Sequence, residues 1–237
     1  MKGFVRCCCI VMLLLAWTGL ARAALSVSKP MAAYARDMEY FYVEKRQEAL
    51  PGIVRSFDAA GVLRDAGKRM MLAAFIAEVM VQYPGTRTRF YPPPVRSQQV
   101  DAVIAWAAHL AQLSDAEAVS RNLLEGRDAL RRQIASSPAP LTKWNILSEP
   151  TVLHMFWGAY FVGADNRYLD PIIEACLRFA DLTASGRRND PGFEAGREAA
   201  ATLFDFAPRH KKVQERLRHF LERTSGARAE TLQTILR

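Results

Sequence analysis

Apolar residues recur three and four positions apart along almost the whole chain, and this spacing restricts the fold more than any other feature of the sequence. The series opens with Tyr34, Met38, Phe41 and Tyr42 and continues to the last residues. Side chains at such intervals share one face of an α-helix. After the first 23 residues, no stretch alternates apolar and polar residues as a half-buried strand would. The sequence therefore predicts an all-α protein.

Turn and capping residues divide this pattern into about ten helices. Ser114 and Glu117 have the spacing of a capping box, and the Asp-Pro pairs at 170–171 and 190–191 are typical of helix starts. Short loops between the helices favour stacked antiparallel pairs, an αα-superhelix. The predicted helices cover residues 34–45, 51–61, 65–83, 98–112, 114–134, 150–161, a segment starting at 171, and residues 193–206, 211–223 and 227–236.

The first 23 residues have the three-part order of a secretory signal peptide. Lys2 and Arg6 make the start positive, an almost wholly apolar run covers residues 7–20, and Ala21-Arg22-Ala23 offers small residues to a signal peptidase. We expect cleavage after Ala23 and export to the periplasm or cell envelope. The apolar run is shorter than the roughly 20 residues of a membrane span, so an uncleaved membrane anchor is the less favoured alternative.

The remaining residues, 24–237, are predicted to form a single helical-repeat domain, with a candidate subdomain boundary at the Pro-containing segment 136–149. Removal of the leader leaves Cys176 as the only thiol, so no intramolecular disulfide is expected. Cys176 shares a helical face with apolar neighbours and should pack as a small hydrophobic residue.

The positive charge of the chain does not indicate nucleic-acid binding. Loss of Lys2, Arg6 and Arg22 leaves 29 basic residues against 24 acidic ones, a net charge of about +5. No basic cluster interleaved with aromatic residues is present, and an exported protein seldom meets nucleic acid. We therefore expect no nucleic-acid partner, and contact with a membrane only through an uncleaved signal.

Two segments of the sequence are alike, which points to helical repeats. Residues 75–81 (FIAEVMV) resemble residues 156–162 (FWGAYFV) at a distance of 81 residues, or two units of about 40. Small residues at Ala77, Gly158 and Ala159 would permit close approach of helices. Coincidence between two apolar helices is the alternative.

Residues 156–168 (FWGAYFVGADNRY) and the stretch 200–217 carry a wider resemblance. They are similar to segments of uncharacterised exported bacterial α-helical proteins whose helix pairs are tetratricopeptide-like. The standard tetratricopeptide spacing is not met, so the resemblance implies the architecture and not that family. It implies no catalytic residue.

Searches for catalytic, metal and cofactor motifs find none that is complete. Residues 61–69 approach a phosphate-binding loop but have five residues between the glycines instead of four, and Arg69 stands where Ser or Thr should bind magnesium. A helix start is the simpler interpretation. The four histidines include no HExxH pair, and no G-x-S-x-G motif is present. We expect no metal and no cofactor.

Glu78 is the most unusual residue in a predicted helix. It lies in the run Leu72–Val81, which is apolar on nearly every face. A buried carboxylate needs a partner or a proton, which is true of catalytic acids and also of structural carboxylates paired with arginine. We favour the structural role. Asp205, between Leu203-Phe204 and Phe206, invites the same interpretation.

Aromatic residues concentrate in the middle of the chain, and some are candidates for a binding groove. Stacked helix pairs curve and expose a concave surface, which Trp157 and Tyr160 would line if they did not belong to the core. Trp144 follows Pro140 in a predicted loop and is the aromatic residue that we most expect at the surface. The candidate binding residues are therefore Glu78, Trp144, Trp157 and Tyr160.

The leading hypothesis is a non-catalytic, exported helical-repeat protein that binds a protein or peptide in the bacterial cell envelope. It follows from the architecture and from the lack of a catalytic constellation. The alternative is an envelope enzyme or small-ligand-binding protein that uses Glu78 in a pocket between helices. A structural subunit of an envelope assembly is a third hypothesis.

Overall fold

The computed structural model describes residues 29–148 and 150–237, and in these ranges every regular element is helical. The α-helices are α2 (Lys29–Glu39), α3 (Phe41–Glu44), α4 (Leu50–Ala59), α5 (Ala66–Gln82), α6 (Gln98–Leu110), α7 (Ala116–Leu123), α8 (Asp128–Ser136), α9 (Pro150–Gly163), α10 (Asn166–Ala184), α11 (Phe193–Phe206), α12 (Lys211–Leu221) and α13 (Gly226–Leu236). Four short 3-10 helices join them: η1 (Gln47–Ala49), η2 (Val62–Arg64), η3 (Pro84–Arg89) and η4 (Leu141–Lys143).

The all-α class is confirmed, with slightly more helices than the ten or so predicted. The expected signal peptide, residues 1–23, lies outside the described residues. Within the described residues, no helix has both the length and the apolar character that a membrane crossing requires.

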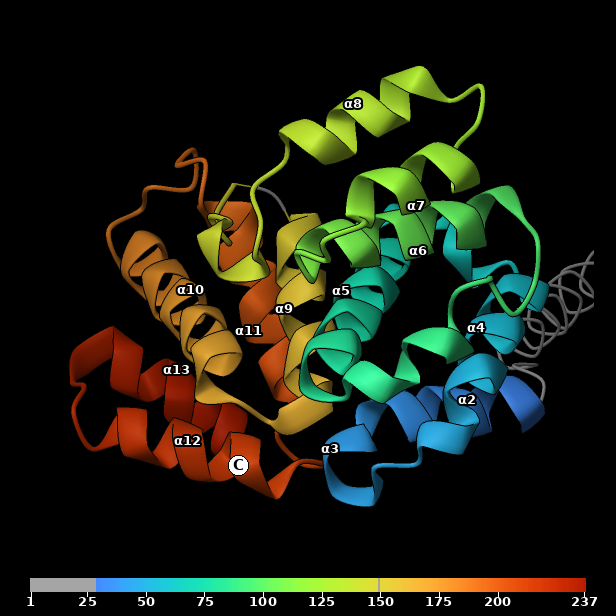
Figure 1. Cartoon of the computed structure of the whole chain (residues 1–237). Coiled ribbons are helices and arrows are strands. Elements are labelled where there is room, and N and C mark those ends of the chain that lie inside the picture. Colours follow the sequence, from blue (N-terminus) through green and yellow to red (C-terminus); the bar gives the residue numbers. More distant parts are fainter. Residues whose placement is uncertain (1–28, 149) are drawn as a thin grey trace, which may run out of the picture.

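Helices α5 and α9 form the centre of the molecule (Figure 1). Each is apolar on nearly all faces, so each is stable only when other helices surround it. They cross closely because α9 has a glycine at the contact: a Cβ atom on Gly158 would lie 2.1 Å from the main-chain oxygen of Met71. The close approach expected from the small residues of these two segments is therefore confirmed. The two alike segments, 75–81 and 156–162, belong to this central pair.

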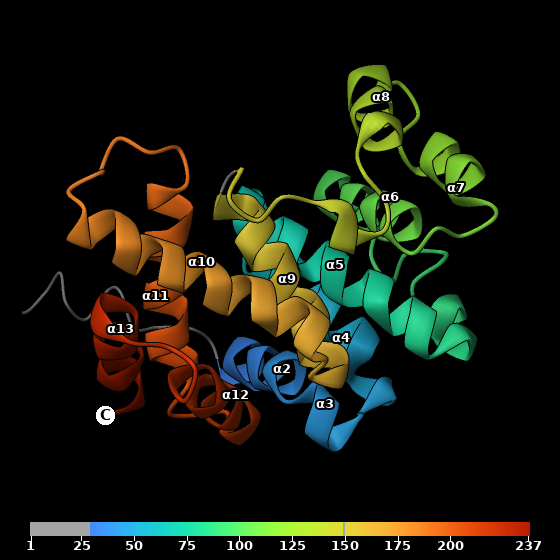
Figure 2. The same ribbon diagram turned by 90° about the vertical axis from the view of Figure 1, so that its left-hand side faces the viewer.

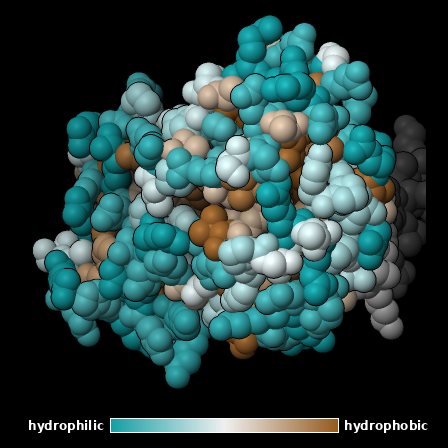
Figure 3. Space-filling view, viewed as in Figure 1, coloured by the Kyte–Doolittle hydropathy of each residue, from teal (hydrophilic) through white to brown (hydrophobic). Residues whose placement is uncertain are grey.

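The other helices cover the central pair from several sides. Helix α6 packs on α5, with α7 and α8 beyond it, while α10 packs on α9 and carries α11 and α13 (Figures 1 and 2). Helices α2, α3 and α4 lie at the end where α12 begins (Figure 1). In the view of Figure 3 the surface is mostly hydrophilic, and hydrophobic side chains reach it in the middle of the face. One core extends from Met38 to Ile235.

The predicted helix 114–134 is in fact two helices, α7 and α8. Gly126 has φ = +72°, a left-handed conformation that ends helical geometry between them. The predicted capping box was wrong: Asp115 is the N-cap of α7, no side chain caps it, and Glu117 pairs with Arg121 instead. The two helices turn away from each other, and α8 lies at the edge of the molecule (Figure 2).

The helix start predicted at Pro171 was also wrong. Helix α10 begins at Asn166, where Asp165 accepts a hydrogen bond from the backbone N–H of Arg167 at 2.9 Å, and Pro171 lies inside the helix. Asp170 instead forms a two-pronged ion pair with Arg216, at 2.7 and 2.6 Å. Asp165 is followed by Asn166 and not by a proline, so the Asp-Pro rule pointed to Asp170 instead.

Of the segment 136–149, the structure describes residues 136–148, and those after Ser136 follow α8. In it, η4 places Leu141 in the core. Helix α5 precedes this segment in the chain and α9 follows it, and the two helices pack against each other. The candidate subdomain boundary stays a prediction about independent folding. Cys176 is fully buried in α10, as expected, and burial raises the pKa of its thiol to about 12.

Candidate functional site

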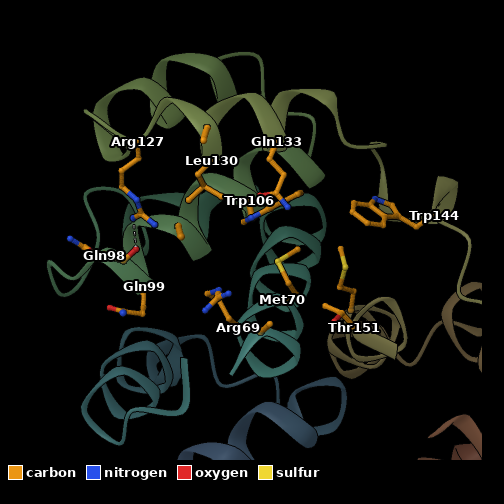
Figure 4. Close-up of a pocket in the computed structure, with 14 residues that line it drawn as sticks. Arg69, Met70, Gln98, Gln99, Trp106, Arg127, Leu130, Gln133, Trp144 and Thr151 are labelled. Atoms are coloured by element: carbon orange, nitrogen blue, oxygen red, sulfur yellow. Dashed lines mark hydrogen bonds between the residues drawn. The ribbon is translucent and has the colours of Figure 1, made fainter. Parts of the chain in front are cut away.

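A hollow of about 630 Å³ lies beneath α8 and is the most developed candidate site of the described residues. We call it the α8 pocket. Its lining comes from α5, α6 and α9, mostly from their first turns, from the inner face of α8, and from Trp144 in the loop before α9 (Figure 4). Pockets that bind small molecules and short segments of chain commonly have volumes of about 300–1,000 Å³. The α8 pocket is therefore large enough to be a binding site.

Two tryptophans form the aromatic wall of the α8 pocket. Trp106 is buried in the Ala-rich helix α6, and its ring centroid is 6.2 Å from that of the half-buried Trp144. The indole N–H of Trp144 donates a hydrogen bond of 2.7 Å to the carbonyl of Pro138, which fixes the ring in the loop. Met70 and Met155 extend the apolar surface from α5 and α9. Such a wall suits an apolar or aromatic group.

Two arginines reach the α8 pocket, Arg69 from α5 and Arg127 from the position just before α8. Arg69 donates to the carbonyl oxygen of Leu63 at 2.9 Å, and Arg127 donates to that of Gln98 at 2.8 Å (Figure 4). These carbonyl groups hold the guanidinium groups in place without cancelling their charges. Among the described residues, none that lines the pocket is acidic, and neither arginine takes part in an ion pair.

Glu78 is buried in α5, and both of its carboxylate oxygens are engaged. Oε1 accepts hydrogen bonds from Arg167 at 2.7 Å and from Gln82 at 2.8 Å, and Oε2 accepts one of 2.5 Å from the hydroxyl of Tyr168. Burial, together with this hydrogen bond, raises the pKa of Tyr168. Arg167 and Tyr168 belong to the first turn of α10, whose positive end also favours a carboxylate.

Glu78 also lines a smaller hollow, of about 280 Å³, between α5, α6 and the start of α10. Arg167 and Tyr168 line it too, so the carboxylate shares this hollow with two titratable partners. To accept a proton from a ligand, the carboxylate would have to give up one of its present partners.

Trp157 and Tyr160 lie in the core. They are 1% and 0% exposed, and the indole N–H of Trp157 donates to the hydroxyl of Thr202 at 3.0 Å. The Tyr160 hydroxyl is buried and has no hydrogen-bond partner among the described residues. Burial raises its pKa. These two candidates therefore do not share a surface with Trp144, and we do not place them in the site.

His210 lies in the same aromatic core and is fully buried. Its ring stacks on Tyr40 and Phe161, with centroid distances of 4.8 and 5.7 Å. The Tyr42 hydroxyl lies 3.1 Å from Nδ1, and Oε2 of Glu39 lies 3.9 Å from Nε2. A proton on Nε2 suits both neighbours, so Tyr42 donates to Nδ1. Burial, helped by the nearby charge of Arg209, lowers the pKa of His210 to about 4.

The expectation for Asp205 was wrong, because its side chain is exposed on α11. The neighbouring Phe204 is exposed as well, so this turn of the helix faces solvent. The helix start expected in place of a phosphate loop is confirmed: Asp65 caps α5 by accepting from the backbone N–H of Lys68 at 2.9 Å. Among the described residues, no group of three or more His, Cys, Asp or Glu side chains is arranged for a metal ion.

Sequence reasoning found Trp144 but missed the rest of the α8 pocket. Trp106 has the spacing of a core residue, and Arg69 drew attention only as a departure from a phosphate loop. Arg127 follows the glycine that separates α7 from α8, a break that the sequence analysis did not predict. The one sequence signal for this part of the pocket was Gly126, which indicates a turn next to Arg127.

Comparisons with protein-family models, curated proteins and solved structures find no match to this chain.

Proposed function

We propose that this chain is an exported, non-catalytic protein of the bacterial cell envelope that binds a protein or peptide, on a scaffold of tetratricopeptide-like helix pairs. The α8 pocket carries the proposal. It combines an aromatic wall, formed by Trp106 and Trp144, with two arginines that no carboxylate neutralises in the described lining. Concave sites with apolar walls and a few fixed polar groups are typical of binding proteins.

The rigidity of the pocket supports binding without a large rearrangement. Arg69 and Arg127 are held by backbone carbonyls, and Trp144 is held by its indole N–H. Groups fixed in advance lose little conformational entropy when a ligand binds. Export is supported by the sequence order of residues 1–23.

The alternative function, an envelope enzyme or small-ligand-binding protein, is supported by the hollow beside Glu78. That hollow is less than half the volume of the α8 pocket, at about 280 against 630 Å³, and its carboxylate is already satisfied. We therefore favour binding at the α8 pocket.

Site-specific photo-crosslinking in intact cells tests the proposed function. A photoreactive phenylalanine analogue replaces Gln133, at the exposed rim of the α8 pocket, and in the matched control it replaces Arg223, exposed after α12. We expect one dominant polypeptide adduct from position 133 and none from position 223. Substitution of Trp144 by Ala should remove that adduct. Equal adducts from both positions, or none from position 133, would contradict the proposal.

The same cells test export. The chain recovered from the envelope fraction should have an intact mass corresponding to a first residue of Ala24. A mass that includes residues 1–23 would indicate an uncleaved anchor, and recovery from the cytosol alone would contradict export.

A further inference from the structure

The α8 pocket has a charged end and an apolar end. Arg127, Gln98 and Gln99 lie at one end, the guanidinium of Arg69 lies between them and the centre, and Trp144 lies at the other end (Figure 4). A ligand that fills the pocket must therefore carry an anionic group close to an apolar one. The two ends together restrict the class of ligand, because a bare anion would use only the charged end and a plain hydrocarbon only the apolar end.

The electrostatic surroundings of the charged end favour an anion. Asp101 is the acidic group that Arg127 influences, and it pairs with Arg96 at 3.7 Å. Burial raises the pKa of Asp101, and the charges of Arg96 and Arg127 partly offset that effect. Asp101 pairs with Arg96 and offsets part of the charge of Arg127, but it does not line the pocket, so no acidic side chain of the described lining faces a bound anion.

The helix ends around the pocket add to its positive character. The first turns of α5, α6, α8 and α9 all contribute to the lining, and the amino end of a helix carries a partial positive charge. Asp65, Asp101 and Asp128 reduce this charge at α5, α6 and α8, since each lies in or next to the first turn of its helix. The arginines are therefore the main source of positive charge.

The hollow between α7 and α8 provides a contrast. It is larger, at about 760 Å³, and four of its five Asp, Glu and Arg residues form opposite pairs: Arg121 contacts Glu117 at 2.9 Å, and Arg131 contacts Asp128 at 2.5 Å. The fifth, Arg132, has no ion-pair partner among the described residues. Its described lining contains two acidic residues and no Trp, Tyr or Phe. The combination of an aromatic wall, two arginines and no acidic residue in the described lining thus distinguishes the α8 pocket.

Building on the function proposed above, we propose that the α8 pocket binds the free C-terminal carboxylate of a peptide whose last residue is apolar or aromatic. The guanidinium N–H groups of Arg127 and Arg69 donate hydrogen bonds to the carboxylate oxygens, because the planar guanidinium group matches the geometry of a carboxylate. The terminal side chain packs against Trp106, Trp144 and Met155. The amide groups of Gln98 and Gln99 both donate and accept, as the peptide groups of a bound chain require.

Fluorescence anisotropy with matched peptides tests this inference. The probes are fluorescein-Gly-Ser-Gly-Ala-Phe with a free carboxylate, the same peptide as its C-terminal amide, and a version ending in Gly. We expect the free-carboxylate Phe peptide to bind at least tenfold more tightly than the other two. Its affinity should fall as salt rises, because exposed charges are screened.

Variants of Arg127 show whether the charge acts at the proposed place. Arg127→Gln should weaken binding of the carboxylate peptide at least fivefold and leave the amide peptide unchanged, while Arg127→Lys should weaken it less. Arg89→Gln is the matched control, because Arg89 is exposed on η3 and lies outside the pocket. Circular dichroism shows whether each variant is folded. As a second variant, Trp144→Leu should weaken binding of the Phe peptide and leave binding of the Gly peptide unchanged.

Each other outcome has a defined meaning. Equal binding of the acid and the amide overturns the carboxylate inference and leaves peptide binding intact. Competition by inorganic phosphate as effective as that by the unlabelled peptide also overturns the inference, because it identifies a simple anion site. If no peptide binds but the crosslinked adduct still forms at position 133, only the inference fails. If the adduct is absent as well, the proposed function fails with it.

Discussion

Glu78 illustrates how a charged side chain is accommodated in an apolar helix. Three donors engage its two oxygens, and two of them, Arg167 and Tyr168, come from a helix that begins almost ninety residues later. A carboxylate transferred from water into a core without partners would be strongly destabilising. Here the partners replace the lost water, and the Arg167 side chain is 49% exposed, so the ion pair lies at the edge of the core.

Replacement of Glu78 by Gln should lower the free energy of unfolding by about 1–3 kcal/mol. The NH₂ group of the new amide would face groups that also donate hydrogen bonds, and Arg167 would lose its charged partner. The exposed guanidinium regains water, which keeps the cost below that of a fully buried pair. Urea unfolding followed by circular dichroism measures the change.

Glu117→Gln is the control for this substitution, since Glu117 pairs with Arg121 on the exposed face of α7. Its effect should be about 0–0.5 kcal/mol, the usual value for surface pairs. If the two substitutions destabilise the protein equally, Glu78 does not have the structural role described above.

At the scale of elements, the crossing of α5 and α9 determines the architecture. Both helices were predicted with nearly correct ends, because Asp65 and Pro150 are local start signals. Their pairing was not predicted, because two helices that are apolar on all faces have no unique side that identifies a partner. Gly158 selects the crossing point by allowing backbone contact there.

Gly158→Ala should therefore be strongly destabilising, by about 3 kcal/mol, in spite of the better helix propensity of alanine. The added Cβ atom would lie 2.1 Å from the main-chain oxygen of Met71, and a backbone atom of a packed helix moves aside less easily than the end of a flexible side chain. Thermal and urea unfolding measure the effect.

Gly163→Ala, in the same helix, is the matched control. Its Cβ atom would meet the amide nitrogen of Gln82 at 2.7 Å, and this flexible side chain is able to turn away with the loss of one hydrogen bond, the one it donates to Glu78. We expect a change of at most about 1 kcal/mol, of either sign. A larger loss at position 163 than at 158 would refute the close crossing.

On the scale of the whole molecule, residues near both ends of the described chain meet around His210. The Tyr40 hydroxyl donates to the carbonyl of Arg209 at 3.2 Å, and Arg209 pairs with Glu39 at 2.8 Å. The ring of His210, the residue before α12, stacks on Tyr40, which lies between α2 and α3, and on Phe161 of α9. Burial raises the pKa of Glu39, which Arg209 partly offsets.

The lowered pKa of His210 gives the whole fold a defined pH dependence. The ordinary pKa is 6.5 and the folded value is about 4, so the unfolded chain binds the proton more readily. The contribution of His210 to stability is present above pH 6.5 and is lost as pH falls toward 4, by roughly 1.4 kcal/mol per pH unit and about 3 kcal/mol in all.

Substitution of His210 by Phe should remove this part of the slope, and urea unfolding at several pH values measures the difference from the unmodified protein. Glu39 and Arg209 remain in the variant, so the difference isolates the histidine. The surface substitution His219→Gln is the control. A variant with an unchanged slope between pH 4 and 6.5 would show that His210 is not buried in its neutral form.

The sequence by itself determined the helical class, most helix boundaries, the burial of Cys176 and the need of Glu78 for partners. Periodicity, prolines and caps act over a few residues, so these features can be deduced from neighbouring positions. Only the tertiary structure decided that α5 pairs with α9, that Arg167 and Tyr168 engage Glu78, and that Trp106, Arg69 and Arg127 meet Trp144 beneath α8. Such contacts join residues far apart in the chain, and the packing of complete helices, which no local pattern records, brings them together.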